Sequence, residues 1–512
     1  MLAKIESRAI YGISSYRVDV EVDISSGIPN FSIVGLPDAA CRESSKRVMA
    51  ALKNSGYHLP SLRITVNLAP AYLKKEGSMY DLAIALGILA AMDKFDKDLL
   101  ENKVVCGELS LDGSLRPIKG ALPIADELRD QTSKKLIMPY KNRVEISIAE
   151  GVNIIYGNTL NETIRYLVEN ITPDNIEPHA TPITPPQDTG LDYSDIKGNA
   201  VAKRAVEIAV AGGHNILLIG SPGIGKTMIA RRLPTIMGGL SRTESIETSK
   251  IYSVSGLLNK TSSLIEVAPF RTLHHSISDA GMLGGGSNQN IRPGEISLAH
   301  NGVLFLDELP EFRRDVLEAL RQPLEEGIIR ISRSNMHITY PAQFMLVAAM
   351  NPCPCGFLTH PDKTCTCTPP QIQRYLSKIS GPLLDRIDIH LEVQPIRYEQ
   401  MRSTQPGENS AEIRSRVGEA RRIQLKRYSK YKYKVNSKLP HKLLEKFCEI
   451  TDEAAGILKN AMDELFISAR AYDKMLRIAR TIADLDQEPI IGVEEISEAI
   501  SYRTLDTRVW LP

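Results

Sequence analysis

The feature that most constrains this fold is a glycine-rich segment placed between an apolar strand and a helix. Between the apolar run at 215–219 and a helix start at 228–233 lie Gly220, Ser221, Pro222, Gly223, Ile224, Gly225, Lys226 and Thr227. The pattern fits G-x-x-x-x-G-K-[ST] in the strand–loop–helix context of a phosphate-binding loop. Its glycines let backbone N–H groups turn toward phosphate oxygens, and the helix N-terminus adds a positive dipole. Lys226 is expected to reach the β- and γ-phosphates, and the Thr227 hydroxyl to ligate Mg²⁺.

Two further apolar strands end in polar residues that suit the same chemistry. The strand at 302–306 runs into Asp307 and Glu308. Asp307 suits the Mg²⁺ shell, and Glu308 suits orienting and polarising an attacking water. The strand at 344–350 ends in Asn351, which can hold that water, although Asn also ends strands as a turn former. Together the three strands predict ATP hydrolysis with Mg²⁺.

The pattern along the chain divides it into four parts. Five prolines in the twenty residues 171–190 indicate a linker. Before it, alternating strands at 16–24 and 61–68 and a dense apolar helix at 81–92 predict a mixed α+β block. After it, strands and helices alternate as expected of an α/β domain with a parallel sheet, and the last part is helical. The expected boundaries are 1–168, 169–190, 191–395 and 396–512.

Composition narrows the class of protein. The 512 residues carry 62 Lys+Arg against 61 Asp+Glu, a formal net charge of +1, so the overall charge does not mark a nucleic-acid binder. No run reaches 18 apolar residues, which argues against a membrane span and a membrane partner. The N-terminal residues lack the plan of a signal peptide. A cytoplasmic protein is therefore expected.

Four of the seven cysteines fall within fifteen residues. They are Cys353, Cys355, Cys365 and Cys367, in the spacing C-x-C-x9-C-x-C. Four thiolates this close can close a tetrahedral Zn²⁺ site, although the spacing differs from the usual C-x2-C. Reduced free thiols and a redox-labile pair remain alternatives. Cys41, Cys106 and Cys448 are isolated, and we expect them to be packed.

A basic stretch lies in the helical last part. Residues 414–434 hold nine Lys/Arg and one Glu, with tyrosines interleaved among the lysines. Charge for phosphates and rings for bases suit a surface that tracks a nucleic-acid strand, and make Lys430 and Lys432 candidate contacts. The alternative is a solvated helix face.

Three long segments carry a resemblance to a known family. They read FRTLHHSISDAGMLGGGSNQNIRPGEISLAHNGVLFLDELPEF at 270–312, AAMNPCPCG at 348–356 and QIQRYLSKISGPLLDRIDIHLEV at 371–393. They resemble the magnesium-chelatase-like AAA+ ATPases of the ComM/YifB family, and the similarity covers the whole chain. The resemblance implies an α/β multidomain protein with an AAA+ P-loop core and an α-helical lid, preceded by an α+β Lon-protease-like domain.

The resemblance also implies roles for single residues. Residues 220–227 match Walker A, Asp307 and Glu308 match Walker B, and Asn351 matches sensor 1. Arg386 stands where related ATPases place an arginine finger that serves the neighbouring subunit, with a salt bridge to Asp385 or Asp388 as the alternative. Arg470 resembles sensor 2, and Arg477 competes for that role.

The family is described as hexameric helicases that drive branch migration of DNA during natural transformation. Single-stranded or branched DNA, further copies of the chain and recombination proteins are the implied partners. The stretch from 226 to 307, which includes His274 and His275, holds an insertion that projects toward the ring pore in the resembled clade. A β-hairpin expected at 327–344 lines the pore in related helicases, which makes Arg330 and Arg333 candidate phosphate contacts, or else solvated hairpin charges. A protein remodeller and a metal-chelatase-type motor are the alternatives.

The first block resembles a Lon-protease domain without its catalytic pair. Met79 stands at the position of the serine nucleophile, with Ser78 one residue away. Ile124 stands at the position of the catalytic lysine, and Lys119 is five residues early. Without a Ser–Lys pair the nucleophile has no base to activate it, so a pseudo-protease domain used for oligomerisation or DNA contact is expected.

Overall fold

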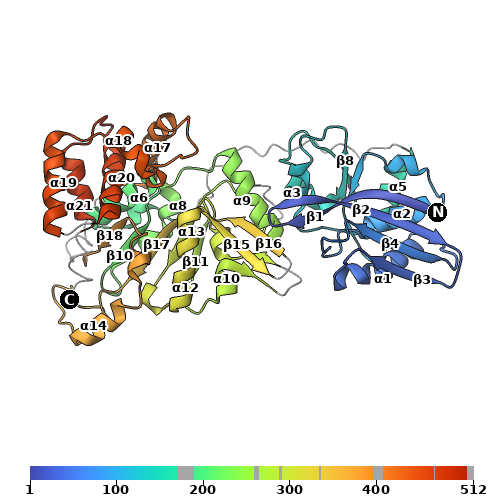
Figure 1. Ribbon diagram of the computed structural model, residues 1–512, viewed down its shortest axis with the longest axis horizontal. Coiled ribbons are helices and arrows are strands. Elements are labelled where there is room, and N and C mark those ends of the chain that lie inside the picture. Colours follow the sequence, from blue (N-terminus) through green and yellow to red (C-terminus); the bar gives the residue numbers. More distant parts are fainter. Residues whose placement is uncertain are drawn as a thin grey trace.

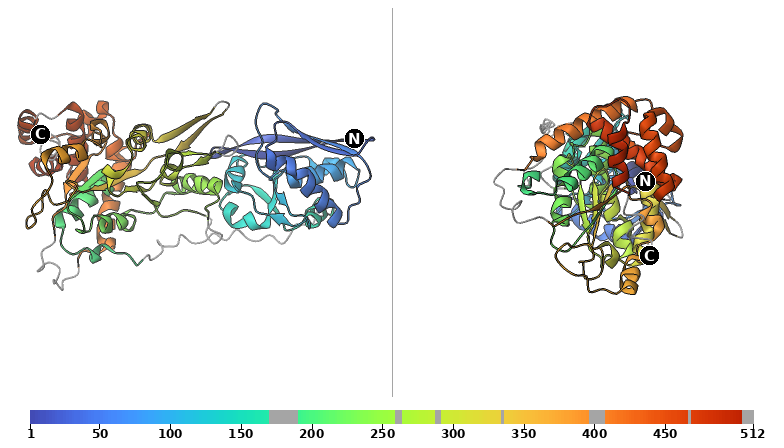
Figure 2. Two further views of the ribbon diagram at one scale, coloured as in Figure 1. Left: turned by 90° about the horizontal axis from the view of Figure 1, so that it is seen from below. Right: turned by 90° about the vertical axis from the view of Figure 1, so that its left-hand side faces the viewer.

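The computed structural model describes residues 1–169, 190–258, 264–286, 291–333, 336–395, 407–465 and 468–503. The molecule is elongated: the first strands lie at one end, the C-terminal helices at the other, and a parallel sheet between them (Figures 1 and 2). The predicted proline-rich linker, apart from its end residues, falls outside the described ranges.

Residues 1–169 are built on a seven-stranded mixed sheet. In spatial order its strands are β3 (Asn30–Val34), β4 (Arg63–Ala69), β2 (Ser14–Ser25), β1 (Leu2–Tyr11), β5 (Lys103–Val105), β8 (Lys135–Pro139) and β9 (Asn153–Gly157). A short ribbon joins β6 (Glu108–Leu109) to β7 (Leu115–Arg116). The helices are α1 (Ala39–Asn54), α2 (Asp81–Ala91), α3 (Ala121–Glu127), α4 (Arg143–Ile146) and α5 (Leu160–Glu169).

The expected strands and helix of this block are confirmed as β2, β4 and α2. Along β2 buried and less buried side chains alternate, because successive side chains of a strand point to opposite faces. Every residue of α2 is buried, so the helix is apolar all round apart from Asp81. The Asp81 carboxylate accepts two hydrogen bonds from Arg47, at 2.8 and 3.1 Å, which neutralise it.

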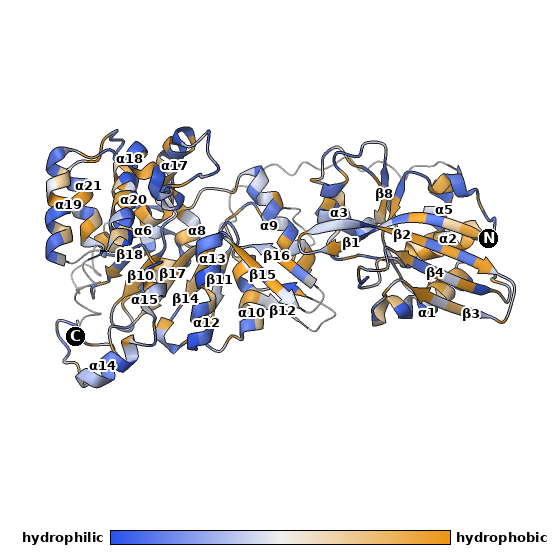
Figure 3. Cartoon of the chain, in the orientation of Figure 1, coloured by the Kyte–Doolittle hydropathy of each residue, from blue (hydrophilic) through white to orange (hydrophobic). Residues whose placement is uncertain are grey.

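The middle of the molecule is a five-stranded sheet in which all strands run parallel, as predicted. Its spatial order is β11 (Phe270–Leu273), β14 (Val303–Leu306), β17 (Met345–Met350), β10 (Ile216–Ile219) and β18 (Ile389–Glu392). The three inner strands are buried throughout and coloured as hydrophobic in Figure 3. Sheets covered on both faces favour such continuous apolar runs.

Two separate cores cover the faces of this sheet. Ile216 and Leu218 point into one core, and Leu217 and Ile219 into the other. The helices of residues 190–395 are α6 (Ala200–Gly212), α7 (Lys226–Arg231), α8 (Leu233–Ile236), α9 (Arg242–Ser255), α10 (Asp279–Leu283), α11 (Glu295–Leu298), α12 (Arg314–Ala319), α13 (Arg321–Glu326), α14 (Pro369–Leu376) and α15 (Gly381–Leu384). A two-stranded ribbon pairs β12 (Gly284–Gly285) with β13 (Arg292–Pro293).

The regular elements described after residue 407 are all helical, as predicted. They are α17 (Ser410–Arg427), α18 (Leu444–Phe447), α19 (Asp452–Leu465), α20 (Ala469–Leu485) and α21 (Val493–Ser501), with two short 3₁₀ turns. Their apolar faces share one core with α6 and the central sheet. These helices are therefore packed directly on the sheet. Within the described ranges no helix combines the length and hydropathy needed to cross a bilayer.

The predicted hairpin is confirmed as β15 (Ile328–Arg333) and β16 (Met336–Pro341). It lies beside the end of β1 in Figure 1. The Tyr11 hydroxyl donates to the His337 carbonyl at 2.5 Å. A second contact joins the block to α9, where the Ser253 hydroxyl donates to Glu145 and Lys250 pairs with Asp126. The first block thus touches the central part at two separate places.

Candidate active site

The phosphate loop, residues 220–227, joins β10 to the N-terminus of α7. Gly223 and Gly225 have φ values of +79° and +95°, which only glycine adopts without strain. Gly225 is also the residue that precedes the first turn of α7. The loop therefore presents a helix N-terminus at the carboxyl edge of the parallel sheet, where α/β proteins bind ligands.

Lys226 is buried at the centre of this loop. Its Nζ donates to the carbonyls of Gly220 and Ser221 at 2.6 and 2.9 Å and to Oδ1 of Asn351 at 3.1 Å. Burial lowers the pKa of Lys226 to about 8, although Asp307 and Glu308 act in the opposite direction. An ammonium held away from water is stabilised by an anion, so the site fits a phosphate chain.

Thr227 and Asp307 meet across the loop. The Thr227 hydroxyl donates to Oδ2 of Asp307 at 2.7 Å. Hydroxyl and carboxylate oxygens are the ligands that Mg²⁺ prefers, and a phosphate group completes such a shell. The donor set therefore fits the expected Mg²⁺. The structure brings together Lys226, Thr227, Asp307 and Asn351, all predicted from the sequence.

Glu308 follows Asp307 in a left-handed conformation, with φ +54°. Such strain in a non-glycine residue is concentrated at functional sites. Its side chain is 60% exposed, and its Oε2 lies 3.9 Å from Nδ1 of His275. No local sequence pattern connects these two residues. Leu273 of β11 pairs with Leu306 of β14, so His275 and Glu308, each two residues further along, lie at the same height beyond the sheet. Their proximity follows from β11 and β14 being neighbours, which the sequence does not show.

Arg386 lies at the opposite, amino edge of the same sheet. It precedes β18, and its carbonyl accepts from the side chain of Asn215, which precedes β10, at 2.9 Å. The guanidinium, 13% exposed, pairs with Glu325. The alternative partners Asp385 and Asp388 are not the ones found. Asp388 lies instead 3.2 Å from Lys474.

The two candidates for sensor 2 differ in their surroundings. Arg470 is exposed in the first turn of α20. The Nε of Arg477 donates to the Leu439 carbonyl at 2.8 Å, so this guanidinium is bound within the C-terminal helices. Arg470 is thus the candidate that faces solvent.

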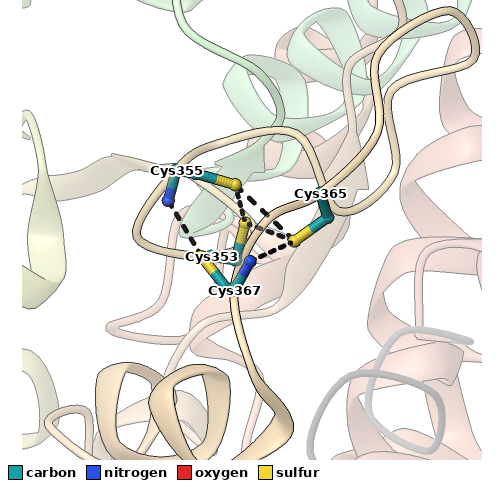
Figure 4. A group of neighbouring side chains, drawn as sticks. All are labelled: Cys353, Cys355, Cys365 and Cys367. Carbon is teal, nitrogen blue, oxygen red and sulfur yellow. Dashed lines mark hydrogen bonds between the residues drawn. The ribbon is translucent and has the colours of Figure 1, made fainter.

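The cysteine cluster, Cys353, Cys355, Cys365 and Cys367, follows Asn351. Its four sulfurs converge from two ends of one loop and lie within 4.8 Å of one another (Figure 4). Three of their separations are 3.4, 3.6 and 3.7 Å. Zn–S bonds of about 2.3 Å give a tetrahedron with edges of about 3.8 Å. The cluster therefore has the dimensions of a four-thiolate metal site.

Backbone amides around the cluster favour thiolates. The N–H groups of Phe357 and Thr366 lower the pKa of Cys355 to about 5, whereas burial and the neighbouring thiols raise the pKa of Cys353. The N–H groups of Cys355 and Cys367 also point at sulfurs, each at 3.4 Å. Because metals bind the thiolate, these donors suit a metal ligand set. Cys41, Cys106 and Cys448 are buried outside the cluster, as expected.

The candidate DNA contacts differ in exposure and pairing. Arg330, 52% exposed, pairs with Glu326, and the side chain of Arg333 lies outside the described residues. Lys430 and Lys432 are exposed in the turns after α17. Arg330 is therefore paired within its own chain.

The basic stretch is partly structural, which corrects the sequence interpretation. Arg416 pairs with Glu207, and Arg427 with the buried Asp484. Tyr428 is buried and donates to Asn436 at 2.7 Å, so it is not available for stacking on bases. The sequence could not show this, because the partners lie on other helices.

The first block has no Ser–Lys pair at the expected positions. The Ser78 hydroxyl donates to Glu108, and Ile124 is fully buried. Met79 packs against two cores, and the Lys119 side chain lies against Gly256 of the central part. Ser78 and Lys119 therefore have separate neighbours, Glu108 and Gly256.

Comparison with known proteins identifies the family. The model "Magnesium chelatase, subunit ChlI" matches residues 192–401, "Subunit ChlI of Mg-chelatase" matches 20–142, and "Magnesium chelatase, subunit ChlI C-terminal" matches 407–503. The protein YifB of Escherichia coli (strain K12) is 42% identical over 513 residues, 99% of this chain and 97% of YifB. Competence protein ComM of Haemophilus influenzae is 43% identical over 98% of each chain.

Part of the chain is also similar to a protein of a different kind. Lon protease 2 of Bacillus subtilis is 26% identical over 184 residues, 32% of this chain and 33% of the protease. The AAA+ character of the magnesium chelatase family supports an ATPase motor that uses ATP and Mg²⁺. Since these two relatives are more than 40% identical over nearly their whole length, the chain belongs to the ComM/YifB family of magnesium-chelatase-like proteins.

Proposed function

We propose that the protein is an ATP-driven DNA motor that forms a hexameric ring. Hydrolysis would drive branch migration while transforming DNA is integrated by homologous recombination in the cytoplasm. The meeting of Lys226, Thr227, Asp307 and Asn351 at one edge of a parallel sheet carries the ATPase part of the proposal. The name of its relative, a competence protein, supports the DNA part.

The chain's own residues would divide the work of hydrolysis. The loop amides and Lys226 would bind the phosphate chain, and Thr227 and Asp307 would hold Mg²⁺. Mg²⁺, when bound, neutralises charge on phosphate oxygens. Glu308 would orient and polarise the attacking water, and Asn351 would hold that water in place.

Arg386 and Arg470 would serve the nucleotide of a neighbouring copy. Arg386 lies at the amino edge of the sheet, away from the phosphate loop of its own chain. Arg470 precedes Lys474 by one helical turn, and the Lys474 ammonium donates to the Ile387 carbonyl at 3.0 Å. Two arginines on the side away from their own phosphate loop suit a site completed between subunits.

DNA would run along surfaces that keep unpaired charge. Lys430 and Lys432 are exposed and suit phosphate contacts. Arg333 remains a candidate on the β15–β16 hairpin, whereas Arg330 would first have to leave Glu326. Recombination proteins are the partners that such a motor would meet.

Each of the two large sheets falls within one proposed domain. Residues 1–168 would be a Lon-like pseudo-protease domain, 169–190 a linker, 191–395 the AAA+ core and 396–512 the lid. The contacts of Ser78 and Lys119 support a structural use of the first domain, because neither side chain pairs with the other.

The cysteine cluster would hold a structural Zn²⁺. Four thiolates with separations near those of a tetrahedral site support this metal. All four ligands come from the chain, which leaves no open position for catalysis.

The ATPase rate with no DNA, single-stranded DNA, duplex and a four-way junction tests the DNA motor. Low salt with Mg²⁺ is required, because phosphate contacts weaken as salt rises. Stimulation that is largest with the junction supports the proposal, and Lys226→Ala gives the background. Stimulation by an unfolded protein would favour a remodeller. A rate that neither DNA nor protein changes would favour a chelatase-type motor.

A further inference from the structure

The segment that carries the cysteine cluster lies directly against the phosphate loop. Gly356 stands inside the cluster's first turn, with φ +82°. A Cβ added there would lie 2.5 Å from Cδ and 2.8 Å from Cγ of Pro222. The backbone of Gly356 therefore lies against the ring of Pro222, with no room for a side chain between them.

Two other contacts join the same two segments. The N–H of Gly220 donates to the Met350 carbonyl at 3.2 Å, and Lys226 donates to Asn351 at 3.1 Å. The phosphate loop is thus supported from one side by residues 350–356. The contact with Gly356 is the one nearest the tip of the loop.

Few interactions other than those of the four sulfurs fix the conformation of the segment that supports the phosphate loop. Of residues 351–368, all within the described part, only Pro352, Cys353 and Gly356 are buried. None of these eighteen residues belongs to a helix or strand, and the segment contributes one side chain, Cys353, to the buried hydrophobic core. A loop without its own core depends on a cross-link for its conformation, and metal binding supplies one.

We propose that metal in the cysteine cluster positions Gly356 against Pro222 and thereby holds the phosphate loop in its nucleotide-binding conformation. Affinity for nucleotide then depends on occupancy of a metal site that touches neither phosphate nor Mg²⁺. The inference rests on two parts of the proposed function, residues 220–227 as the nucleotide site and the cysteine cluster as a Zn²⁺ site; it does not require DNA.

The test measures metal content and nucleotide binding on the full-length chain. Metal is counted by mass spectrometry of the purified protein, and the Kd of a fluorescent ATP analogue is measured with excess Mg²⁺. The double variant Cys365→Ser/Cys367→Ser should lose its zinc and raise the Kd about tenfold. Gly356→Ala should keep its zinc and raise the Kd as well, because the added methyl displaces Pro222.

Two controls isolate the mechanism. Cys448→Ser removes a buried thiol elsewhere. Gly56→Ala imposes the same kind of strain, at φ +92°, where an added Cβ meets nothing within 4 Å. Both should leave metal content and Kd unchanged.

Three results would overturn the proposal: wild-type protein without metal after growth with zinc, a metal-free double variant with wild-type Kd, or Gly356→Ala with wild-type Kd. If the double variant fails to fold, Gly356→Ala decides. A wild-type chain that binds no nucleotide would instead refute the proposed function.

Discussion

The ammonium of Lys226 lies 3.1 Å from the side-chain oxygen of Asn351, a residue 125 positions later in the chain. Their strands, β10 and β17, are neighbours in the sheet, with Ile219 level with Met350. The residue that is expected to bind phosphate and the residue that is expected to hold water are therefore fixed relative to each other by backbone hydrogen bonds. Binding and hydrolysis should be separable by substitutions at this point.

Lys226→Ala should abolish nucleotide binding, because Lys226 is the one Lys or Arg among residues 220–227. Glu308→Gln should bind ATP normally and retain it, since the amide cannot polarise water. Binding of a fluorescent ATP analogue and single-turnover hydrolysis distinguish the two defects. Equal hydrolysis by wild type and Glu308→Gln would refute the role of Glu308.

Asn351→Ala should lower the rate of hydrolysis about a hundredfold while changing the Kd for ATP by less than about threefold. The loss falls mainly on hydrolysis because the Asn351 amide holds the water rather than the phosphates, and the backbone hydrogen bond from Gly220 to Met350 still supports the phosphate loop. The same two assays measure it. Asn460→Ala, which changes an exposed asparagine of α19, is the matched control. A large loss of ATP affinity in Asn351→Ala would contradict the assigned role.

Arg386→Ala and Lys226→Ala should each lower the ATPase rate about a thousandfold when alone. In an equal mixture, intact phosphate loops of one variant meet intact Arg386 side chains of the other. Random assembly makes about a quarter of the interfaces complete, so part of the rate should return. A mixture as inactive as its components would show that Arg386 does not act on a neighbour.

Asp388→Asn should destabilise the contact between α20 and β18. Burial alone would raise the pKa of Asp388, but Lys474 and His214 outweigh it and hold the pKa well below its usual range. The ammonium of Lys474, 11% exposed, would be left without its carboxylate, at a cost of about 3 kcal/mol. Denaturant unfolding at pH 7 measures this loss, and adding Lys474→Met should recover part of it.

The pH dependence follows from the same pair. A lowered pKa in the folded state contributes stability above the ordinary Asp value, about 3.9, and this contribution is lost as pH falls below it. The difference between wild type and Asp388→Asn should therefore shrink below about pH 4. A difference independent of pH would mean that the Asp388 charge is not its source.

The double variant Lys430→Glu/Lys432→Glu should lower the affinity for DNA of any base sequence by a similar factor. Loss of two phosphate contacts should lower the slope of log K against log salt by about 2. The control Lys442→Glu/Lys459→Glu changes two exposed lysines of the same helical region by the same charge. Equal slopes for both double variants would remove residues 430 and 432 from the DNA path.

Local patterns were sufficient for the phosphate loop and for most elements of the fold. A Walker A loop is defined by consecutive residues, and the alternation along β2 or the apolar run of β14 depends on each strand's own side chains. The spacing of four cysteines likewise pointed to the cluster before its geometry was known.

Contacts between distant segments were not predictable. The proximity of His275 to Glu308 depends on β11 lying beside β14, and the pairing of Arg386 with Glu325 depends on how α13 packs. The burial of Tyr428 could not be predicted without knowing that the chain after α17 folds back and brings Asn436 to its hydroxyl. A single sequence gives the periodicity of each element but not the order in which elements meet.

The separation of the phosphate loop and Arg386 on opposite edges of one sheet has a genetic consequence. If each nucleotide is enclosed by the loop of one copy and the arginine of the next, a defective copy harms a site that belongs to its neighbour. Alleles of this gene that assemble normally but cannot hydrolyse ATP would then be dominant over wild type. Alleles that fail to assemble would be recessive.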